Sequence, residues 1–383
     1  MRPSWVVGHD NWGILLFVHA TPFDPLAAQR APGDPEVDVL LQGMVFLDII
    51  FSGLDRMPAG GEEIWADGMG SCPGGVANLA VAAARLGLRT SLSAAFGDDD
   101  YGDFCWRTLA EQERIDLAHS KRFERWHTPV TVSISMDGDR RMITHGHDAP
   151  EPASVIMGPP PRSRAVLFDL TQDPTADDTA WIDTAHQQGA LLFAEVGFDD
   201  TGVWKQATLD QLDRCHAFTP NAVEAMAYTR TDTPYDALSA LADRVPLAVV
   251  TNGAQGALAI DSTTGEEAIV PALRVPTTDP TGAGDVFCAA LALGTLAKWE
   301  LRHRLNFATL CSSLAVQEFG GSLAAPGWGD IADWWQAHRA QTTGTALDRA
   351  IRRRFEFLDD LVPAIPPSAV RRAAATIAQR SDV

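Results

Sequence analysis

Short apolar runs of strand type alternate along the chain with segments whose apolar residues recur at helical spacing. The strand-like runs are Val37–Gln42, Leu88–Ala95, Ala165–Leu170, Ala190–Ala194 and Leu247–Val250. The helical segments are Val76–Leu86, Tyr101–Glu113 and Val286–Ala297. This alternation is typical of a parallel sheet whose crossover connections are helices on both faces. The sequence therefore predicts an α/β fold in three layers, α/β/α, around a mainly parallel central sheet.

A second pattern predicts a small group of strands outside that sheet. Thr128–Met136 and Arg141–His145 flank Asp137-Gly138, a strong hairpin signal, and polar and apolar residues alternate in the first of these runs. Together with Ile49–Trp65, this antiparallel ribbon is expected to form a small β-strand lid over a cleft. The lid would comprise about residues 49–66 and 128–146.

The two ends of the chain differ in composition from its centre. Residues 1–36 are rich in Pro and Gly and are expected to form an irregular N-terminal extension, and residues 37–340 to form one folded domain. Residues 341–383 are Arg-rich and predict a C-terminal helical tail. Its apolar face favours docking on the acidic body or on a second subunit over binding to nucleic acid. That face comprises Leu347, Ala350, Ile351, Phe355, Leu358, Leu361 and Val362.

Composition and charge narrow the classes of function. With 46% hydrophobic residues the 383-residue chain can bury a large core, and its net charge of −20 disfavours nucleic acid and membrane surfaces as partners. Its five cysteines are never spaced C-x-x-C, which argues against a disulfide framework or a zinc ribbon and favours the cytoplasm. The apolar run Ile14–Val18 is too short for an export signal or a membrane span.

The segment Asp279-Pro-Thr-Gly-Ala-Gly-Asp285 comes directly before a predicted helix and carries the most informative chemistry. The small residues Gly282, Ala283 and Gly284 let the backbone turn sharply, so that N–H groups at the helix start converge on one point. These groups and the helix dipole stabilise an anion without a lysine. Asp285 is placed to accept a proton from a hydroxyl beside that anion. Read alone, the segment could be a Gly-rich turn with an Asp helix cap.

Three motifs resemble those of one enzyme family. Asp279–Asp285 resembles the C-terminal signature D-T-x-G-A-G-D of the ribokinase-like (PfkB) carbohydrate kinases, with Pro280 in place of the usual Thr. Gly74–Gly87 followed by Gly97–Gly102 resembles the N-terminal signature, and Gly43–Asp48 resembles the first strand with its sugar-binding aspartate. The resemblance covers about residues 38–338. It implies a ribokinase-like fold and ATP-dependent phosphoryl transfer, with Asp285 as the base and Gly282–Gly284 as the anion hole.

On this resemblance the acceptor sugar is bound by Asp48, Gly74, Gly75 and Asn78. Asp48 and Asn78 also carry the acceptor and donor groups that vicinal hydroxyls require. The N-terminal signature has a structural interpretation too: Arg85–Gly87 fits a helix C-cap, and Gly97–Gly102 fits cap and turn chemistry.

The resemblance extends to the nucleotide side of the site. Asn221 and Glu224 match an N-x-x-E motif whose glutamate helps to organise Mg²⁺ through water, although Asn221 alone would be interpreted as a helix N-cap. Thr251, Gly253 and Gly256 match a T-x-G-x-x-G segment that runs along ATP.

The adenine and cation sites are less complete. Thr309 stands where the family has an Asn beside adenine, and Ala324 stands where a cation-binding Ser is frequent. Asp279 and Thr281 are nevertheless candidates for a monovalent-cation site, which makes K⁺ a candidate cofactor beside ATP and Mg²⁺.

The identity of the acceptor is less well defined. In relatives that take phosphorylated sugars or ribose a lysine commonly accompanies the Gly pair, whereas here Val76 follows it. A phosphorylated sugar is therefore disfavoured, and an unphosphorylated ketose or aldose such as fructose or ribose is the first choice. A keto-deoxy sugar acid, met by Arg140 or Arg141, and a nucleoside remain alternatives. Phe193–Asp199 also departs from the D-x-N-x-R pattern of relatives.

Other classes of function are less consistent with the sequence. A non-catalytic sugar or nucleotide sensor is opposed by the intact Asp285, and a Rossmann oxidoreductase by the lack of G-x-G-x-x-G after the first strand. A metal site at His145-Gly-His147-Asp148 is disfavoured because no supporting scaffold is evident in the sequence. An exposed lid strand favours a homodimer.

Overall fold

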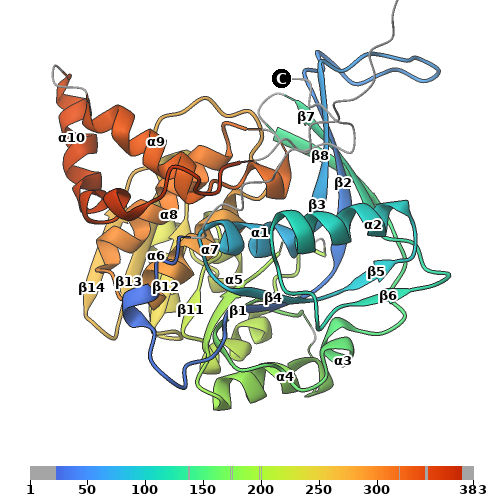
Figure 1. The fold of residues 1–383 in the computed structure, drawn as a ribbon, viewed down its shortest axis with the longest axis horizontal. Coiled ribbons are helices and arrows are strands. Elements are labelled where there is room, and N and C mark those ends of the chain that lie inside the picture. Colours follow the sequence, from blue (N-terminus) through green and yellow to red (C-terminus); the bar gives the residue numbers. More distant parts are fainter. Residues whose placement is uncertain are drawn as a thin grey trace, which may run out of the picture.

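The central sheet has eight strands, six of them parallel. A computed structural model of the chain describes residues 23–372 apart from 137, 138, 173, 175, 198, 200, 319 and 341–343. The strands are β1 (Val37–Gln42), β4 (Thr90–Ser93), β9 (Ser163–Asp169), β10 (Leu191–Glu195), β11 (Ala217–Phe218), β12 (Leu247–Thr251), β13 (Ala257–Asp261) and β14 (Glu266–Val270). Their order is β14-β13-β12-β11-β10-β9-β1-β4, with an antiparallel hairpin, β13 and β14, at one edge (Figure 1).

Two hydrophobic cores lie on opposite faces of this sheet because successive strand residues point to opposite sides. Leu41 belongs to one core and its neighbour Leu40 to the other. The first core includes residues of α1 (Ala77–Arg85), α2 (Asp100–Arg107), α7 (Ala283–Leu296), α8 (Leu301–Ala315) and α9 (Trp328–Arg339). The second includes residues of α3 (Ala153–Met157), α4 (Ala176–Gln187), α5 (Ala222–Thr229) and α6 (Pro234–Ala242). The predicted three-layer α/β/α architecture is confirmed.

A separate four-stranded sheet rises from the body as a lid, seen at the upper right of Figure 1. Its strands, in the order β3-β2-β7-β8, are β2 (Val45–Ser52), β3 (Gly68–Gly75), β7 (Val130–Met136) and β8 (Asp139–His145). The predicted ribbon is present as the antiparallel pair β7 and β8, while its turn, Asp137-Gly138, lies outside the described residues. The predicted strand over 49–65 is wrong beyond Ser52, because residues 53–67 contain no strand.

Strand β3 has the sequence GMGSCPGG, which strand propensity alone does not predict. Pairing with β2 along its whole length holds it extended. Its glycines are required by close contacts: a Cβ atom at position 74 would lie 2.0 Å from Asp48 Oδ2. At Gly75, where φ is +62°, a Cβ atom would lie 2.4 Å from the Met44 carbonyl oxygen. The glycine pair is therefore the end of a lid strand rather than only a turn into a helix.

Short elements complete the fold. A small sheet pairs β5 (Ala95–Gly97) with β6 (Lys121–Phe123). One π-helical segment, η2 (Thr108–Gln112), continues α2. The 3-10 segments are η1 (Ala27–Gln29), η3 (Gln206–Arg214), η4 (Gly253–Gln255), η5 (Gly321–Ala324), η6 (Glu356–Asp360) and η7 (Val362–Ala364). None of the helices in the described part is both long and apolar enough to cross a membrane.

Arg85 has a larger role than the predicted helix cap. Gly87 does adopt the left-handed backbone of a cap, with φ of +84°, but the Arg85 side chain is buried. Its guanidinium donates two hydrogen bonds of 2.8 Å to the Glu113 carboxylate. It also donates bonds of 2.7 Å to the carbonyl oxygens of Leu323 and Ala325. The bonds to these two carbonyl oxygens hold η5 and the residue after it against α1, and η5 also contacts the lid strand β3.

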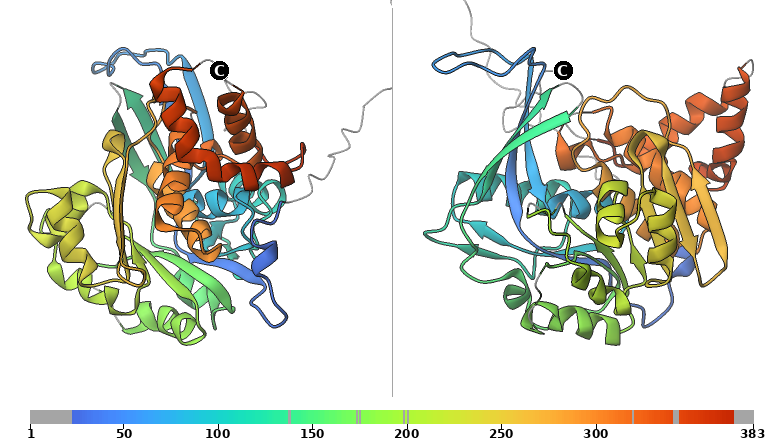
Figure 2. Two further views of the ribbon diagram at one scale, coloured as in Figure 1. Left: turned by 90° about the vertical axis from the view of Figure 1, so that its left-hand side faces the viewer. Right: turned by 180° about the vertical axis from the view of Figure 1, so that it is seen from behind.

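Both ends of the described chain pack on the body. At the N-terminal end, Arg30 forms an ion pair of 2.8 Å with the buried Asp38, and the Phe23 ring contacts Trp328. At the C-terminal end, α10 (Ala346–Phe355) follows α9, and Phe355 and Leu358 are fully buried. Figure 2 shows this C-terminal segment, in dark red, lying along the outside of the body. Leu347, at the start of α10, is 60% exposed, so only part of the predicted apolar face docks.

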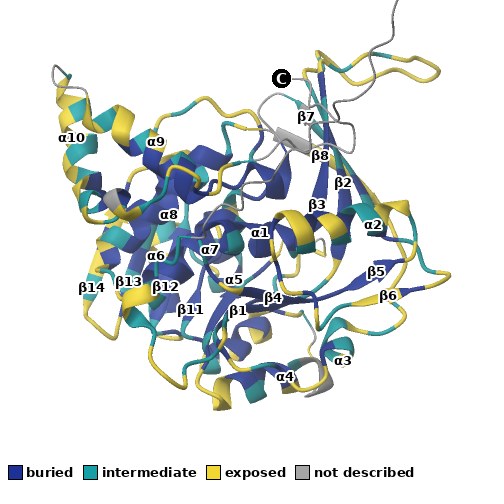
Figure 3. Ribbon diagram, viewed as in Figure 1, coloured by how far each residue is buried: buried dark blue, intermediate teal, exposed yellow. Residues whose placement is uncertain are grey.

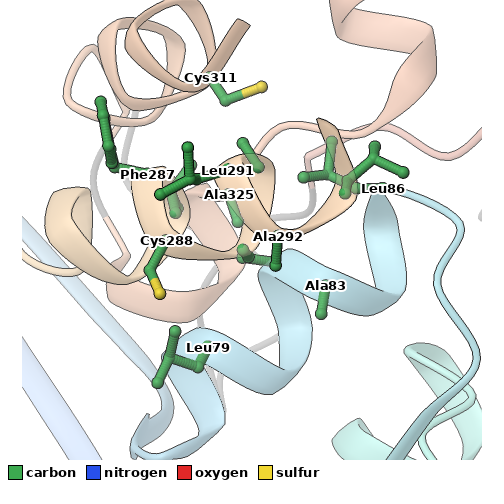
Figure 4. Packing of buried hydrophobic residues seen from close by; sticks show 14 of the residues in the cluster. Leu79, Ala83, Leu86, Phe287, Cys288, Leu291, Ala292, Cys311 and Ala325 are labelled. Atoms are coloured by element: carbon green, nitrogen blue, oxygen red, sulfur yellow. The ribbon is translucent and has the colours of Figure 1, made fainter. Parts of the chain in front are cut away.

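Helix α7 is buried along most of its length (Figure 3). Figure 4 shows Leu79 and Ala83 of α1, Leu291 and Ala292 of α7, and Cys311 of α8 packed in one cluster. Small side chains allow the helix backbones to approach closely. Because its neighbours hold α7 on both sides, the position of its N-terminus is fixed.

Candidate active site

The N-terminus of α7 forms the predicted anion turn. Gly282 is the N-cap residue and has φ of +76°, a left-handed conformation that glycine adopts without strain. Thr281 N–H donates to Asp279 Oδ1 at 2.9 Å, which shapes the turn before the helix. The N–H groups in the first turn of a helix have no partner within it and carry the positive end of the dipole. Asp285 lies in that first turn.

The predicted sugar-binding residues lie beside this turn. Asp48, on β2, lies directly over Gly74, where an added Cβ atom would be 2.0 Å from Asp48 Oδ2. Asn78, in the first turn of α1, lies against Gly282: a Cβ atom there would be 3.6 Å from Asn78 Cγ. A Cβ atom at Gly321 would be 3.8 Å from Asn78 Oδ1. The structure therefore brings the two signatures together, although they are about two hundred residues apart in sequence.

The side-chain oxygen of Asn78 is buried and accepts no hydrogen bond from any described residue. A buried polar group without a partner costs roughly 1–3 kcal/mol. A ligand group that donates a hydrogen bond would remove this cost. Asn78 Oδ1 is thus a candidate acceptor for a hydrogen bond from a ligand.

A cavity of about 710 Å³ adjoins the other side of the anion turn. Its walls include Ala283 and Gly284 at the head of α7. Four of the predicted nucleotide-binding residues line it: Thr251 at the end of β12, Gly253 and Gly256 in the loop that follows, and Thr309 on α8. The Thr309 hydroxyl donates to the Leu305 carbonyl oxygen at 2.7 Å, so its bonding capacity as a donor is used within the helix. Arg274, which sequence reasoning did not single out, also lines the cavity.

Asn221 and Glu224 do not line that cavity but form a capping box at the start of α5. Asn221 Oδ1 accepts from Glu224 N–H at 3.0 Å, and Glu224 Oε2 accepts from Asn221 N–H at 2.9 Å. A bridge between Asn221 and Thr251 places this cap next to the loop after β12. Burial raises the pKa of Glu224. The interpretation of Asn221 as an N-cap is confirmed, which accounts for its side chain without a ligand.

Two further carboxylates, missed in the sequence, lie near Glu224 and Asp285. Asp169 ends β9 and Glu195 ends β10, at the carboxyl edge of the parallel strands, where open α/β sheets bind ligands. Burial, followed by the charges of Asp285 and Asp169, raises the pKa of Glu195 well above its usual value. Among the described residues, no Lys or Arg forms an ion pair with Asp169, Glu195 or Glu224. This group of acids has the oxygen donors that Mg²⁺ prefers.

The candidate monovalent-cation residues are also brought together. Asp279 and Thr281 are both buried. Asp279 Oδ2 and Thr281 Oγ1 lack hydrogen-bond partners among the described residues. Oxygen atoms of this kind are suitable ligands for a hard cation.

Comparison with known proteins decides the family. The family model described as "pfkB family carbohydrate kinase" matches residues 54–327. This chain belongs to the pfkB family. It is therefore a carbohydrate kinase, a phosphotransferase that acts on sugars, as the motifs around Asp285 and Asn78 predict.

Related kinases cover most of the chain. The ribokinase of Bacillus subtilis is 26% identical over 294 residues, spanning 76% of this chain and 96% of the relative. A fructokinase of Klebsiella pneumoniae is 30% identical over 289 residues, spanning 68% and 89%. Among solved structures, Arabidopsis thaliana ribokinase complexed with ribose and ATP has a TM-score of 0.62 at 22% identity and covers 77% of this chain and 96% of its own. The ribokinase-like fold is confirmed.

A single methyl group tests the contact between Asp48 and Gly74. In Gly74→Ala the added Cβ atom displaces the Asp48 carboxylate, and we expect kcat/KM for the sugar to fall about 100-fold, as misplacements near 1 Å can cost. The KM for ATP should change little, because the cavity of about 710 Å³ lies on the other side of the anion turn. Steady-state kinetics with each substrate varied measures both.

Gly60→Ala is the matched control, because a Cβ atom there meets nothing within 4 Å. If Gly74→Ala and Gly60→Ala had the same kcat/KM for the sugar, the prediction that Asp48 belongs to the acceptor site would be contradicted.

Proposed function

We propose that this kinase transfers the γ-phosphate of ATP to a hydroxyl of an unphosphorylated ketose or aldose such as fructose or ribose. The main support for the proposal is that the anion turn separates two features. Asn78 lies against Gly282 on one side of the turn, and the cavity of about 710 Å³ is lined by Ala283 and Gly284 on the other. An acceptor hydroxyl at Asn78 would lie beside a phosphoryl group at the helix head. The relatives named ribokinase and fructokinase support this substrate class.

In the proposed reaction Asp285 accepts the proton of the sugar hydroxyl, whose oxygen attacks the γ-phosphorus while the bond to ADP breaks. Asp48 and Asn78 orient the acceptor. The N–H groups of Gly282–Gly284 and the dipole of α7 stabilise the charge on the phosphoryl oxygens, so that catalysis is mainly positioning and electrostatics. Glu224, Glu195 and Asp169 would hold Mg²⁺, directly or through water. When bound, Mg²⁺ neutralises charge on the nucleotide phosphates.

The register of the lid bears on the charge of the acceptor. Asp48 and Ile50 alternate with residues of the opposite face of β2, and Ser133 pairs with Ile50. Arg141 pairs with Ile134, one residue out of phase with Ser133, so it belongs to the face away from Asp48. This argues against Arg141 as the anchor of a sugar acid, but not against Arg140, which pairs with Ser135, in phase with Ser133.

The acceptor is identified by a panel of ketoses, aldoses, keto-deoxy sugar acids and nucleosides, scored by ADP release from Mg·ATP. We expect an uncharged sugar to give the highest kcat/KM. On that sugar, Asp285→Asn should lower kcat at least about 100-fold, because the amide cannot accept the proton. ATP binding, measured by calorimetry, should persist.

Asp232→Asn, at an exposed position, controls for the loss of one charge. Near-normal turnover by Asp285→Asn would contradict its role as base. If no acceptor on the panel stimulates ADP release by the native enzyme, the proposed catalytic function itself fails.

The proposal includes a K⁺ site at Asp279 and Thr281, supported by their unpartnered buried oxygens. We expect several-fold faster turnover in K⁺ than in tetramethylammonium at equal ionic strength, and loss of that difference in Asp279→Asn. Equal rates in the two salts would refute a functional cation site.

The proposal also includes a homodimer formed through the lid. Strand β8 is at the edge of the lid sheet, and Ile143 on it is 69% exposed. Light scattering should then give twice the chain mass of 41.2 kDa, and Ile143→Lys should give the single mass. Ile269→Lys, at an exposed position on the edge strand β14, is the control. A native protein of single mass would contradict the dimer.

A further inference from the structure

Three histidines gather at the base of the lid, away from the residues assigned above. His127 precedes β7, His145 is the last residue of β8, and His147 follows it by two positions. One ligand nitrogen from each lies within 4.8 Å of the others. The His127 and His145 rings are stacked with centroids 5.1 Å apart, and the His147 ring is 5.0 and 5.3 Å from them.

The hairpin register explains why distant residues meet. Val130 pairs with His145 across β7 and β8, so the residues before β7 and after β8 lie at the same end of the ribbon. In extended backbone, residues two apart point to the same side, which places His145 and His147 together. The sequence segment His145-Gly-His147-Asp148 does not include this third histidine, and a metal site there was disfavoured because no supporting scaffold is evident in the sequence.

The surrounding contacts supply the scaffold that the sequence did not reveal. His127 Nδ1 lies 3.2 Å from the Thr128 carbonyl oxygen; with the proton on Nδ1, Nε2 carries the free lone pair. Trp126 Nε1–H donates to the His147 carbonyl oxygen at 3.3 Å and ties the loop to the end of β8. Thr128 N–H donates to Asp99 Oδ2 at 2.9 Å, which anchors the loop to the body.

We propose that His127, His145 and His147 form a binding site for a transition-metal ion such as Zn²⁺. Three imidazoles suit Zn²⁺, Ni²⁺ or Cu²⁺, whereas the oxygen donors near Asp285 suit Mg²⁺, so the two sites select different ions. Nitrogens bound to one Zn²⁺ at about 2.1 Å in tetrahedral geometry are about 3.4 Å apart. His145 and His147 are exposed, and small rotations of their side chains close the remaining gap.

A bound ion would link the outer lid strand, β8, to the loop that precedes β7. His145 pairs with Val130, and Val130 pairs with Leu47, the neighbour of Asp48 on β2. His127 belongs to the loop anchored at Asp99. A metal ion bound here would therefore cross-link the outer lid strand to the body. The fourth position on the ion is left to water.

The test is titration of the full chain, freed of any polyhistidine tag, with Zn²⁺ in excess Mg²⁺. Calorimetry should show one Zn²⁺ per chain bound by the three-histidine site. His127→Ala, His145→Ala and His147→Ala should each weaken this binding at least about tenfold, since loss of second-sphere contacts alone costs 10–100-fold. His186→Ala, at an exposed position on α4, should leave it unchanged.

The visible absorption spectrum of bound Co²⁺ reports directly on the ligands of the ion, so it separates loss of a ligand from a general structural effect. The native protein and His186→Ala should give the visible absorption of four-coordinate Co²⁺ with nitrogen ligands, and His127→Ala should not. Melting curves without metal check that the variants fold; if His127→Ala does not, the exposed His147→Ala carries the test. The proposal would be overturned if His127→Ala, His145→Ala and His147→Ala bound Zn²⁺ as tightly as His186→Ala does. It would also be overturned if the native chain showed no saturable Zn²⁺ binding.

Discussion

Mutual repulsion among carboxylates at the carboxyl edge of the sheet is the constraint on which the rest of the site depends. Asp169, Glu195 and Glu224 come from the ends of neighbouring strands and the helix that follows, and Asp285 faces them from α7. Burial, and after it the charges of Asp285 and Asp169, raises the pKa of Glu195 well above its usual value. Such an arrangement is unfavourable at neutral pH unless a cation occupies it, and in the proposed reaction Mg²⁺ would be that cation.

The same constraint explains how an acidic protein with three lysines can handle phosphate. Backbone N–H groups at the head of α7 provide positive potential without a side-chain charge that the carboxylates would neutralise. The direction in which these N–H groups point depends on α7 being held in place. The packing of Leu291 and Ala292 against α1 and α8 secures this. The hydrogen bond from Arg85 to the Leu323 carbonyl oxygen holds η5 beside Asn78.

The parts of the fold that could be predicted are those set by local pattern. Alternating apolar runs gave the central strands, and the small residues before Asp285 gave the anion turn. Strand β3 was missed because its glycines are dictated by contact with Asp48 and Met44, which lie elsewhere in sequence. Glu195 and Asp169 were missed because carboxylates are common and only the sheet order makes these two neighbours. His127 was missed for a similar reason, since the register of β7 and β8 alone brings it to His145.

The most direct test of the carboxylate constraint compares the native chain with Glu195→Gln by thermal unfolding at several pH values, with and without Mg²⁺. A carboxyl group whose folded pKa is raised stabilises the fold below its unfolded pKa, near 4.5, and that contribution is lost as pH rises through the folded value. The account predicts that without Mg²⁺ the variant gains stability over the native chain as pH rises toward about 8, and that Mg²⁺ narrows the difference by stabilising the native chain more. A difference that changes with neither pH nor Mg²⁺ would contradict it.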